Sequence, residues 1–370
     1  MFPIDFQRAA TGGLAEKALE LTQAASRAGF DVTMAYAEGG SVCIWDARAR
    51  PHAPPAVRAT SSSALARLRT LVTFWGELES YLDTLRIPPR VVWVRTAPAT
   101  PGQLRFLRSA KRRGARIVVD VPTVAQRSEL RGARAIALRG LATWQREAYA
   151  LADRIATVSE HTELWGRPTV RVVNGVAAVS GLRGVERRPG DEVRVVGFGQ
   201  WAYWHGVDRF LEAWAAAACR ARVSLQLHGG GAALPGLRAR ARRLGLELVC
   251  RASTFGEDRS RVLAEADLGL GALNGRRKGL ATLSGLKHRT YAAHGLPYLV
   301  SDLDHDLRGR LGAYAVPDDE NPVDLDRAVA WLDDLRAHPG YRARVALAVG
   351  DLSWDKTYAA LWDYFAAVSA

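Results

Sequence analysis

The stretch that most constrains the fold lies between residues 280 and 302, LATLSGLKHRTYAAHGLPYLVSD. Its pattern predicts a turn of small residues, a helix that Ser284 caps, and a short buried strand after a glycine and a proline end the helix. A helix that starts at Ser284 and Gly285 offers backbone N–H groups and a positive dipole end, with Lys287 in its first turn. This segment alone fits a phosphate site and an ordinary capped α/β helix equally well.

The same alternation occurs earlier in the chain. A buried strand over Val91–Arg95 is followed by a helix over Pro101–Arg113 and a second strand over Arg116–Asp120. Strand, helix and strand at this spacing are typical of a parallel, doubly wound α/β sheet, whose ligands bind at the carboxyl ends of the strands. We therefore expect Arg95 and Asp120 at such a site, and 370 residues suffice for two domains of ordinary size.

The composition is that of a globular protein, with 48% hydrophobic and 24% charged residues. No apolar run reaches the length of a transmembrane helix, and the first ten residues lack the apolar segment of a signal peptide. The three cysteines lie far apart, which favours neither a disulfide framework nor a metal cluster. These features predict a cytoplasmic protein.

The net charge of +13 belongs mainly to the first half, where residues 1–180 hold 25 Lys and Arg against 15 Asp and Glu. A basic face of this kind fits nucleic acid, anionic lipid or an anionic acceptor, and heavy arginine usage throughout the chain explains it equally well. We expect no nucleic-acid partner. Peripheral contact with the anionic inner face of the membrane stays open.

The segment between residues 280 and 302 resembles a known family. Its matching positions follow the pattern LKxxEYxAxGLP of the family-4 retaining glycosyltransferases: Lys287, Tyr291, Ala293, Gly295, Leu296 and Pro297. The resemblance implies the α/β GT-B fold, in which two Rossmann-like domains face each other across a cleft and a C-terminal helix crosses back to the first domain. On this basis we expect an acceptor domain over 1–180, a linker over 181–192, a nucleotide-sugar donor domain over 193–350 and the crossover helix over 351–370.

Further motifs follow in the order that the family has them. Gly12-Gly13 match the turn beside the donor diphosphate, and WHGVDR at 204–209 resembles a WHG variant found in a bacterial branch of the family. The glycines after His228 match the loop under the nucleoside, and Phe255 matches a position that contacts the base. Arg277 and Lys278 belong to three adjacent cations that fit either phosphate contact or a solvated loop.

Two departures from the family pattern concern charge. The usual Arg and Lys that clamp the diphosphate are replaced by Gln200 and His205, and two usual glutamates are replaced by Thr282 and Thr290. The donor-binding residues that the resemblance implies, together with the loop cations, are Gly12, Gly13, Gly199, Gln200, His205, Gly229, Gly230, Phe255, Arg277, Lys278, Thr282, Ser284, Gly285, Leu286, Lys287 and Thr290.

The resemblance implies transfer of a sugar from a nucleoside diphosphate sugar to a hydroxyl acceptor, with retention of configuration and without a metal or other cofactor. Lys287, His205 and Asp120 are the catalytic candidates, and Arg95, Thr123 and Glu129 the acceptor-binding ones. Small molecules, glycans and lipid-linked sugars all remain possible acceptors, and the donor sugar and base stay open. The alternative is a degenerate GT-B protein that binds a nucleotide or partner without turnover.

Overall fold

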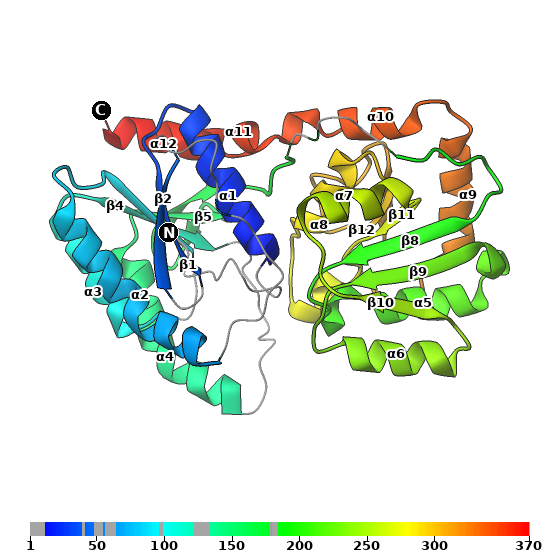
Figure 1. Ribbon diagram of the computed structural model, residues 1–370, viewed down its shortest axis with the longest axis horizontal. Helices are drawn as coiled ribbons and strands as arrows, with labels where there is room; N and C mark the ends of the chain where they lie inside the picture. Colours follow the sequence, from blue (N-terminus) through cyan, green and yellow to red (C-terminus); the bar gives the residue numbers. More distant parts are fainter. Residues whose placement is uncertain are drawn as a thin grey trace. The chain divides into compact units, whose positions relative to one another are not determined.

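The computed structural model describes residues 12–38, 41–47, 55, 64–95, 99–121, 133–177, 179 and 184–369, with 64–72 and 133–141 described by their backbone only. The chain divides into two compact units (Figure 1). Unit 1 comprises Met1–Val173 and Thr357–Ala370, and unit 2 comprises Asn174–Lys356. Among the described helices, none combines the length and hydropathy that a membrane span requires.

Unit 1 contains a five-stranded sheet in the order β3-β4-β5-β7-β6. The first four strands are parallel, and the two-residue β6 pairs antiparallel with β7 at the edge. Their bounds are β3 Val91–Arg95, β4 Arg116–Val121, β5 Arg154–Thr157, β6 Glu163–Leu164 and β7 Arg167–Arg171. The interior positions of β4 are buried, as a central parallel strand covered on both faces requires.

The helices of unit 1 separate into two groups (Figure 1). Neighbouring helices α2, α3 and α4 pack side by side, and the C-terminal helix α12 packs against β3 and β7. The bounds are α1 Gly12–Arg27, α2 Ala64–Thr84, α3 Pro101–Arg112, α4 Ala133–Leu151 and α12 Ala359–Ser369. The return of the C-terminal helix to the first unit, which the resemblance implied, is confirmed.

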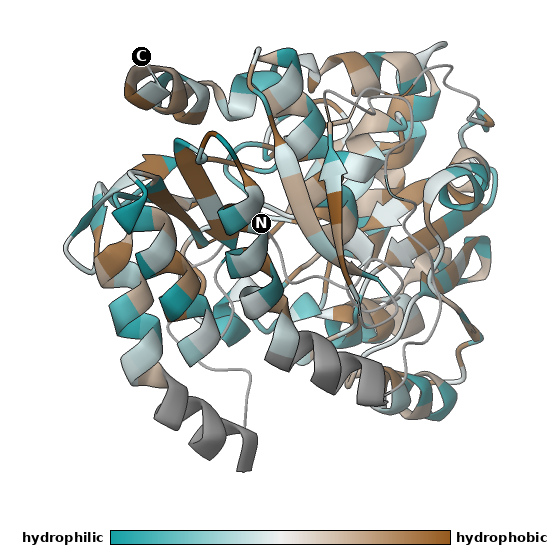
Figure 2. Ribbon diagram, turned by 60° about the vertical axis from the view of Figure 1, so that its left-hand side comes forward, coloured by the Kyte–Doolittle hydropathy of each residue, from teal (hydrophilic) through white to brown (hydrophobic). Residues whose placement is uncertain are grey.

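Aromatic packing holds this last helix in place. The rings of Trp362 and Phe365 lie 6.2 and 6.1 Å from that of Trp93 on β3, and Tyr358 lies 5.8 Å from it. Phe30, just after α1, packs against Phe365 at 5.9 Å. The apolar stripe of the C-terminal segment is therefore core, and Figure 2 shows the hydrophobic colour along α12 and the strands of unit 1.

One strand differs from its prediction. The sequence suggests a strand over Phe30–Tyr36, whereas β1 runs over Thr33–Glu38 and pairs antiparallel with β2 (Ser41–Asp46) as a separate two-stranded sheet. Phe30 packs into the aromatic cluster instead of joining the strand. The short first strand expected before Gly12 lies outside the described residues.

Unit 2 contains a six-stranded, fully parallel sheet in the order β10-β9-β8-β11-β12-β13. Numbered within the unit, this is the order 3-2-1-4-5-6 of a dinucleotide-binding sheet, which changes direction between its first and fourth strands. The bounds are β8 Val193–Phe198, β9 Val223–His228, β10 Leu248–Arg251, β11 Leu268–Leu270, β12 Tyr298–Ser301 and β13 Ala313–Val316.

Helices cover both faces of this sheet (Figure 1). Helices α5, α6 and α9 form one group, and α7, α8 and α10 lie on the other side. The bounds are α5 Val207–Ala216, α6 Leu234–Arg243, α7 Gly256–Glu265, α8 Leu286–Ala293, α9 Leu325–Arg336 and α10 Tyr341–Leu347, and the short α11, Trp354–Thr357, precedes α12. This doubly wound arrangement leaves the carboxyl edge of the sheet to its loops.

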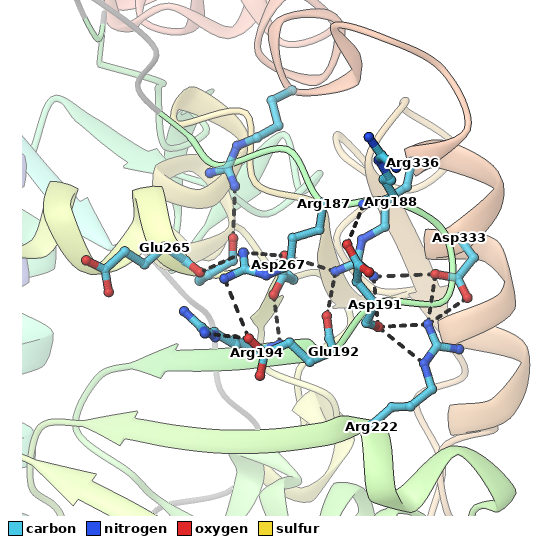
Figure 3. Close-up of polar contacts among 12 residues, drawn as sticks. Arg187, Arg188, Asp191, Glu192, Arg194, Arg222, Glu265, Asp267, Asp333 and Arg336 are labelled. Atoms are coloured by element: carbon cyan, nitrogen blue, oxygen red, sulfur yellow. Dashed lines mark hydrogen bonds and ion pairs between the residues drawn. The ribbon is translucent and has the colours of Figure 1, made fainter.

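The segment expected as a linker packs on unit 2. Asp267, fully buried before β11, accepts the Arg194 N–H at 2.9 Å and pairs with Arg336 at 2.9 Å and Arg187 at 3.3 Å (Figure 3). Arg222 donates to both Asp333 and the carbonyl of Asp191. The described end of the segment, residues 184–192, is thus held by charged contacts.

The boundary between the units also lies earlier than 180. Asn174 donates its backbone N–H to Ser284 Oγ at 2.9 Å, and its carbonyl accepts from Arg289 Nε at 3.1 Å. A Cβ at Gly175 would lie 2.7 Å from the Cα of Trp354, so the chain passes too closely there for a side chain. These contacts explain why unit 2 begins at Asn174.

Replacing Asp267 by alanine should strongly destabilise unit 2. The substitution leaves the buried Arg336 guanidinium without its nearest carboxylate, and breaking a buried pair in this way costs about 3–5 kcal/mol. Urea unfolding measures the loss. Glu257→Ala is the control, because the Glu257–Arg261 pair is exposed and worth about 1 kcal/mol or less. Equal losses in the two variants would contradict the role given to Asp267.

Candidate functional site

The loops after β8 and β11 meet where the strand order of unit 2 changes direction. β8 ends at Phe198 and β11 at Leu270, and the two strands are hydrogen-bonded neighbours. Chain segments leave these two strands in opposite directions along the sheet, and sheets of this order bind their ligands in a crevice at the carboxyl ends of such strands. A ligand of unit 2 is expected at this crevice.

The loops after β8 and β9 approach each other so closely that one position must be glycine. Gly229 has φ +115°, and a Cβ there would lie 2.0 Å from the carbonyl oxygen of Gly199. The Gly199 N–H donates to the His228 carbonyl at 3.0 Å, and Trp201 N–H donates to Gly230 at 2.7 Å. The predicted donor residues Gly199, Gly229 and Gly230 therefore lie together.

Lys287, in the first turn of α8, points its amine at this loop. A Cβ built on Gly199 would lie 3.3 Å from Lys287 Nζ, and the amine lies 4.3 Å from the centre of the Trp201 ring. Nζ is shielded from solvent and has no hydrogen-bond partner among the described residues. Burial lowers the pKa of Lys287 to about 7. Within the part of the chain that the structure describes, this amine thus has an aromatic neighbour and no counter-ion.

His205 lies in the same region as a neutral ring. It ends the short 3-10 turn Tyr203–His205, where its Nδ1 accepts the Ala202 N–H at 2.9 Å, so the ring proton is on Nε2. Burial, with Lys287 nearby, lowers the pKa of His205 well below its usual range. As a neutral imidazole, His205 can donate one hydrogen bond to a ligand from Nε2.

The start of α8 differs from the prediction in its cap. The N-cap is Gly285, which has no side chain to cap the helix, and the Ser284 hydroxyl accepts from the Asn174 N–H. Behind the helix, His288 joins two strand ends: its Nδ1 bonds Asp304 at 2.8 Å and its Nε2 accepts the Ala272 N–H at 2.9 Å. The first turn of α8 is thereby fixed at the crevice without a capping side chain.

Arg277 does not fit the predicted role in phosphate contact. Its guanidinium donates to Asp208 at 2.8 and 2.9 Å, to the Tyr203 carbonyl at 2.8 Å, and through Nε and Nη2 to Glu320. Each of its N–H donors has a protein acceptor, and these contacts raise the pKa of Arg277. The residue joins the loop to α5 and to the chain after β13. Lys278 lies 5.1 Å from the ring of Trp204.

The remaining donor candidates are less engaged with the site. The Thr290 hydroxyl donates to the Leu286 carbonyl within α8 at 3.0 Å, so it keeps only acceptor capacity for a ligand. Thr282 and Phe255 are half-buried. The position of Gln200 is close to the second loop, since a Cβ on Gly230 would lie 3.5 Å from its Oε1.

Unit 1 carries a separate charged cluster at the carboxyl ends of β3 and β4. Arg95 and Asp120 are register partners, and Arg95 Nη1 donates to Asp120 Oδ2 at 2.9 Å. Asp120 is fully buried, and its Oδ1 has no hydrogen-bond partner among the described residues. The two residues predicted for this edge are thus in contact.

Sequence reasoning missed the third member of this cluster, Lys17. Its Nζ lies 4.0 Å from Asp120 Oδ2, and its side chain is only 2% exposed. Burial outweighs the attraction of Asp120 and lowers the pKa of Lys17 to about 8. The signal was a lysine within the apolar face of α1, between Leu14 and Leu21. Gly12 and Gly13 form the first turn of α1 itself, and Thr123 and Glu129 lie outside the described residues.

The described residues include no group of three or more His, Cys, Asp and Glu side chains arranged to hold a metal ion.

Lys287→Met should stabilise the protein near neutral pH. The pKa of Lys287 is lower in the folded state than in the unfolded state, so folding releases protons between about pH 7 and 10.5. The cost of burying this amine is greatest at and below pH 7 and disappears as the pH rises. We expect a gain of up to about 4 kcal/mol at pH 7 that falls to about 1 kcal/mol near pH 10. Urea unfolding from pH 7 to 10 measures it, and a gain independent of pH would contradict the assignment.

Comparison with known proteins finds similarity in structure alone. No protein-family model matches the sequence, and no curated protein matches it. HepE of Anabaena, solved in complex with UDP and glucose, superposes with a TM-score of 0.61 at 12% identity, covering 100% of this chain and 99% of HepE.

Two other solved structures are similar over most of the chain. The trehalose-6-phosphate synthase OtsA has a TM-score of 0.53 at 13% identity, covering 84% of this chain and 78% of its own. A TarM variant of S. aureus, in complex with UDP, has a TM-score of 0.55 at 11% identity, covering 79% of this chain. This chain spans only 58% of the length of TarM. The likeness concerns the backbone, and it shows that the chain has the GT-B fold of glycosyltransferases.

Proposed function

We propose that the protein is a metal-independent, retaining glycosyltransferase that moves a sugar from a nucleoside diphosphate sugar to a hydroxyl acceptor. The observation that carries this proposal is the amine of Lys287, which is shielded from solvent at the crevice of unit 2 and has no counter-ion among the described residues. A buried cation without a partner costs stability, and a bound diphosphate would remove that cost. UDP bound to HepE and TarM makes UDP the first nucleotide to test.

In this proposal the donor diphosphate lies against the first turn of α8. Lys287 would contribute an ammonium, His205 the Nε2–H of a neutral imidazole, and the Leu286 region its backbone N–H groups at the positive end of the helix dipole. The loop glycines Gly199 and Gly229 let the main chain approach the phosphates closely. These fixed donors would stabilise the negative charge that develops on the leaving diphosphate.

Retention, as the sequence resemblance implies, requires no separate protein base. The bond between the anomeric carbon and the phosphate oxygen breaks while the bond to the acceptor oxygen forms on the same face, and the departing phosphate takes the acceptor proton. The protein's task is then to hold the sugar and stabilise the separating charges. Lys287 serves both ground-state binding and the leaving group.

We assign the acceptor to unit 1, at the carboxyl ends of β3 and β4. Asp120 Oδ1 is a buried acceptor without a partner in the described residues, which suits a donor such as a sugar hydroxyl. Arg95 and Lys17 hold the carboxylate in place through their ion pairs. Small-molecule, glycan and lipid-linked acceptors all carry such a hydroxyl. Contact of the basic unit 1 with an anionic membrane is compatible with a lipid-linked acceptor.

A second candidate function is nucleotide binding without turnover. It is favoured by Thr282 and Thr290, which stand where the resembling family has glutamates, and by the Thr290 hydroxyl, which already donates to Leu286. A threonine in place of glutamate offers the donor one hydrogen bond instead of a bidentate contact. Binding of a donor without its hydrolysis and without transfer to any acceptor would favour this candidate.

Nucleotide affinity should depend on the protonation of Lys287. Among UDP, GDP, dTDP and ADP, without metal, we expect one to raise the melting temperature selectively. Its Kd should rise at least about tenfold in Lys287→Met, because a charge-assisted bond to phosphate is lost. Between pH 7.5 and 9 the wild-type affinity should fall by up to about tenfold per pH unit, because the free amine must take up a proton on binding.

Lys287→Arg supplies the matched control for that pH dependence. A guanidinium stays charged throughout this range, so the nucleotide affinity of the variant should be nearly constant with pH. Calorimetric titration in two buffers of different ionisation enthalpy measures the proton uptake directly. Equal affinity in the wild type and Lys287→Met would remove the donor site from this crevice.

Asp120→Asn should affect the acceptor and leave the donor unchanged. The substitution keeps the shape of the side chain but removes the negative charge, so we expect kcat/KM for the acceptor to fall about tenfold or more. The nucleotide Kd should stay within about twofold, since that site belongs to unit 2. Glu163→Gln, at the exposed edge strand β6, is the control. A loss confined to nucleotide affinity would contradict the acceptor assignment.

A further inference from the structure

A basic hollow lies at the amino-terminal edge of the unit 1 sheet. It has a volume of about 470 Å³, and its walls include Arg116, Asp153, Arg154, Arg167, Tyr364 and Val368. The proposed glycosyl transfer uses none of these residues.

The three arginines come together because of the strand order. Arg116, Arg154 and Arg167 are the first residues of β4, β5 and β7, which are consecutive neighbours in the sheet. Parallel strands lie about 4.8 Å apart, so their starting residues gather at one edge. Each arginine lines the same hollow.

These guanidiniums retain most of their hydrogen-bonding capacity. Within the described residues, Arg116 donates to Asp153 Oδ1 at 3.2 Å, Arg154 to the Asp153 carbonyl at 2.9 Å, and Arg167 to the Ala150 carbonyl. Each therefore makes one hydrogen bond to protein although a guanidinium has five N–H donors. Arg277 in unit 2, whose donors all have protein acceptors, shows what a purely structural arginine looks like in this fold.

Asp153 does not neutralise the hollow. Its Oδ2 accepts the Ile117 N–H at 2.8 Å and lies 3.6 Å from Lys111 Nζ. Its Oδ1 accepts a hydrogen bond from Arg116. Among the residues that line the hollow, this one carboxylate stands beside three arginines, and its acceptor capacity is largely used in holding the strand starts together. The excess of positive charge favours a multiply charged anion over a chloride ion.

One wall of the hollow is formed by aromatic and aliphatic side chains. Tyr364 and Val368 come from α12, and the guanidinium of Arg154 lies 5.0 Å from the centre of the Tyr364 ring. A guanidinium stacked on a ring keeps its N–H groups directed outward, where they match two oxygens of a phosphate. The wall offers contact to the carbon skeleton of the same ligand.

The hollow is distinct from the acceptor cluster. Arg116 begins β4, and Asp120 lies near its carboxyl end, so the strand separates the two by roughly 13 Å at 3.3 Å per residue. An anion in the hollow would not reach the Arg95–Asp120 cluster unless it were longer than this.

We propose that this hollow binds a soluble phosphomonoester, with its phosphate between Arg116, Arg154 and Arg167 and its organic part against Tyr364. The site does not depend on the proposed transferase activity. It gives the protein a second anion site, located in unit 1 and separate from the crevice of unit 2.

Calorimetric titration with phenyl phosphate and with inorganic phosphate tests the proposal, in full-length protein carrying Lys287→Met so that the crevice of unit 2 does not contribute. We expect saturable binding with a Kd of about 1 mM or tighter, and tighter binding of phenyl phosphate. Arg154→Gln and Arg167→Gln should each weaken binding at least about tenfold. Arg154→Lys keeps the charge but loses the paired donors, so its Kd should lie between those of the parent protein and Arg154→Gln.

Arg105→Gln is the matched control, because it removes the same charge from an exposed position on α3 outside the hollow, and it should change the Kd less than about twofold. Tyr364→Ala should remove the preference for phenyl phosphate. Equal weakening by Arg105→Gln and Arg154→Gln would reduce the effect to general charge and overturn the site. If neither phosphate bound, or if the protein bound only vesicles containing phosphatidic acid, the proposal of a soluble ligand would be overturned.

Discussion

Parallel strand pairing is the constraint on which the rest of this molecule depends. Because every strand of the unit 2 sheet runs the same way, all six carboxyl ends lie on one edge, and the loops that follow them must share that space. The closest approach, between Gly199 and Gly229, requires glycine and exposes main chain where side chains would otherwise fill the crevice. Lys287 then enters from the helix after β11. The proposed donor site is thus a consequence of sheet topology more than of any single motif.

The cationic side chains of this arginine-rich protein fall into two classes, those with acceptors in the protein and those without. Arg277 has a protein acceptor for each of its N–H donors, and Arg289 and Arg336 pair with the buried carboxylates of Asp304 and Asp267. The amine of Lys287 is shielded from solvent and has no such partner among the described residues. A saturated guanidinium stabilises the fold, whereas an unsatisfied buried ammonium destabilises it unless a ligand binds. By the same reasoning, the arginines of the unit 1 hollow, which have few acceptors in the protein, differ from the three paired arginines of unit 2 named above.

Unit 1 uses the two edges of its sheet differently. At the carboxyl edge, Arg95 and Lys17 converge on one buried carboxylate, Asp120, and leave one of its oxygens available. At the amino edge, the cations outnumber the single carboxylate of Asp153. One edge is therefore suited to a hydrogen-bond donor such as a hydroxyl, and the other to an anion. The basic character of this half of the chain is thus partly concentrated in a defined hollow.

The sequence by itself determined the α/β class, most elements of both sheets and the edge on which Arg95 and Asp120 lie, because the alternation of apolar strands and helices is a local pattern. The resemblance around Lys287 pointed to the GT-B fold from the sequence alone. Only the tertiary structure decided the side-chain partners. It engaged Arg277 with Asp208 and Glu320, assigned the Ser284 hydroxyl to Asn174, made His205 neutral and brought Lys17 to Asp120. These outcomes depend on residues as much as 110 positions apart, and on burial that no local pattern contains.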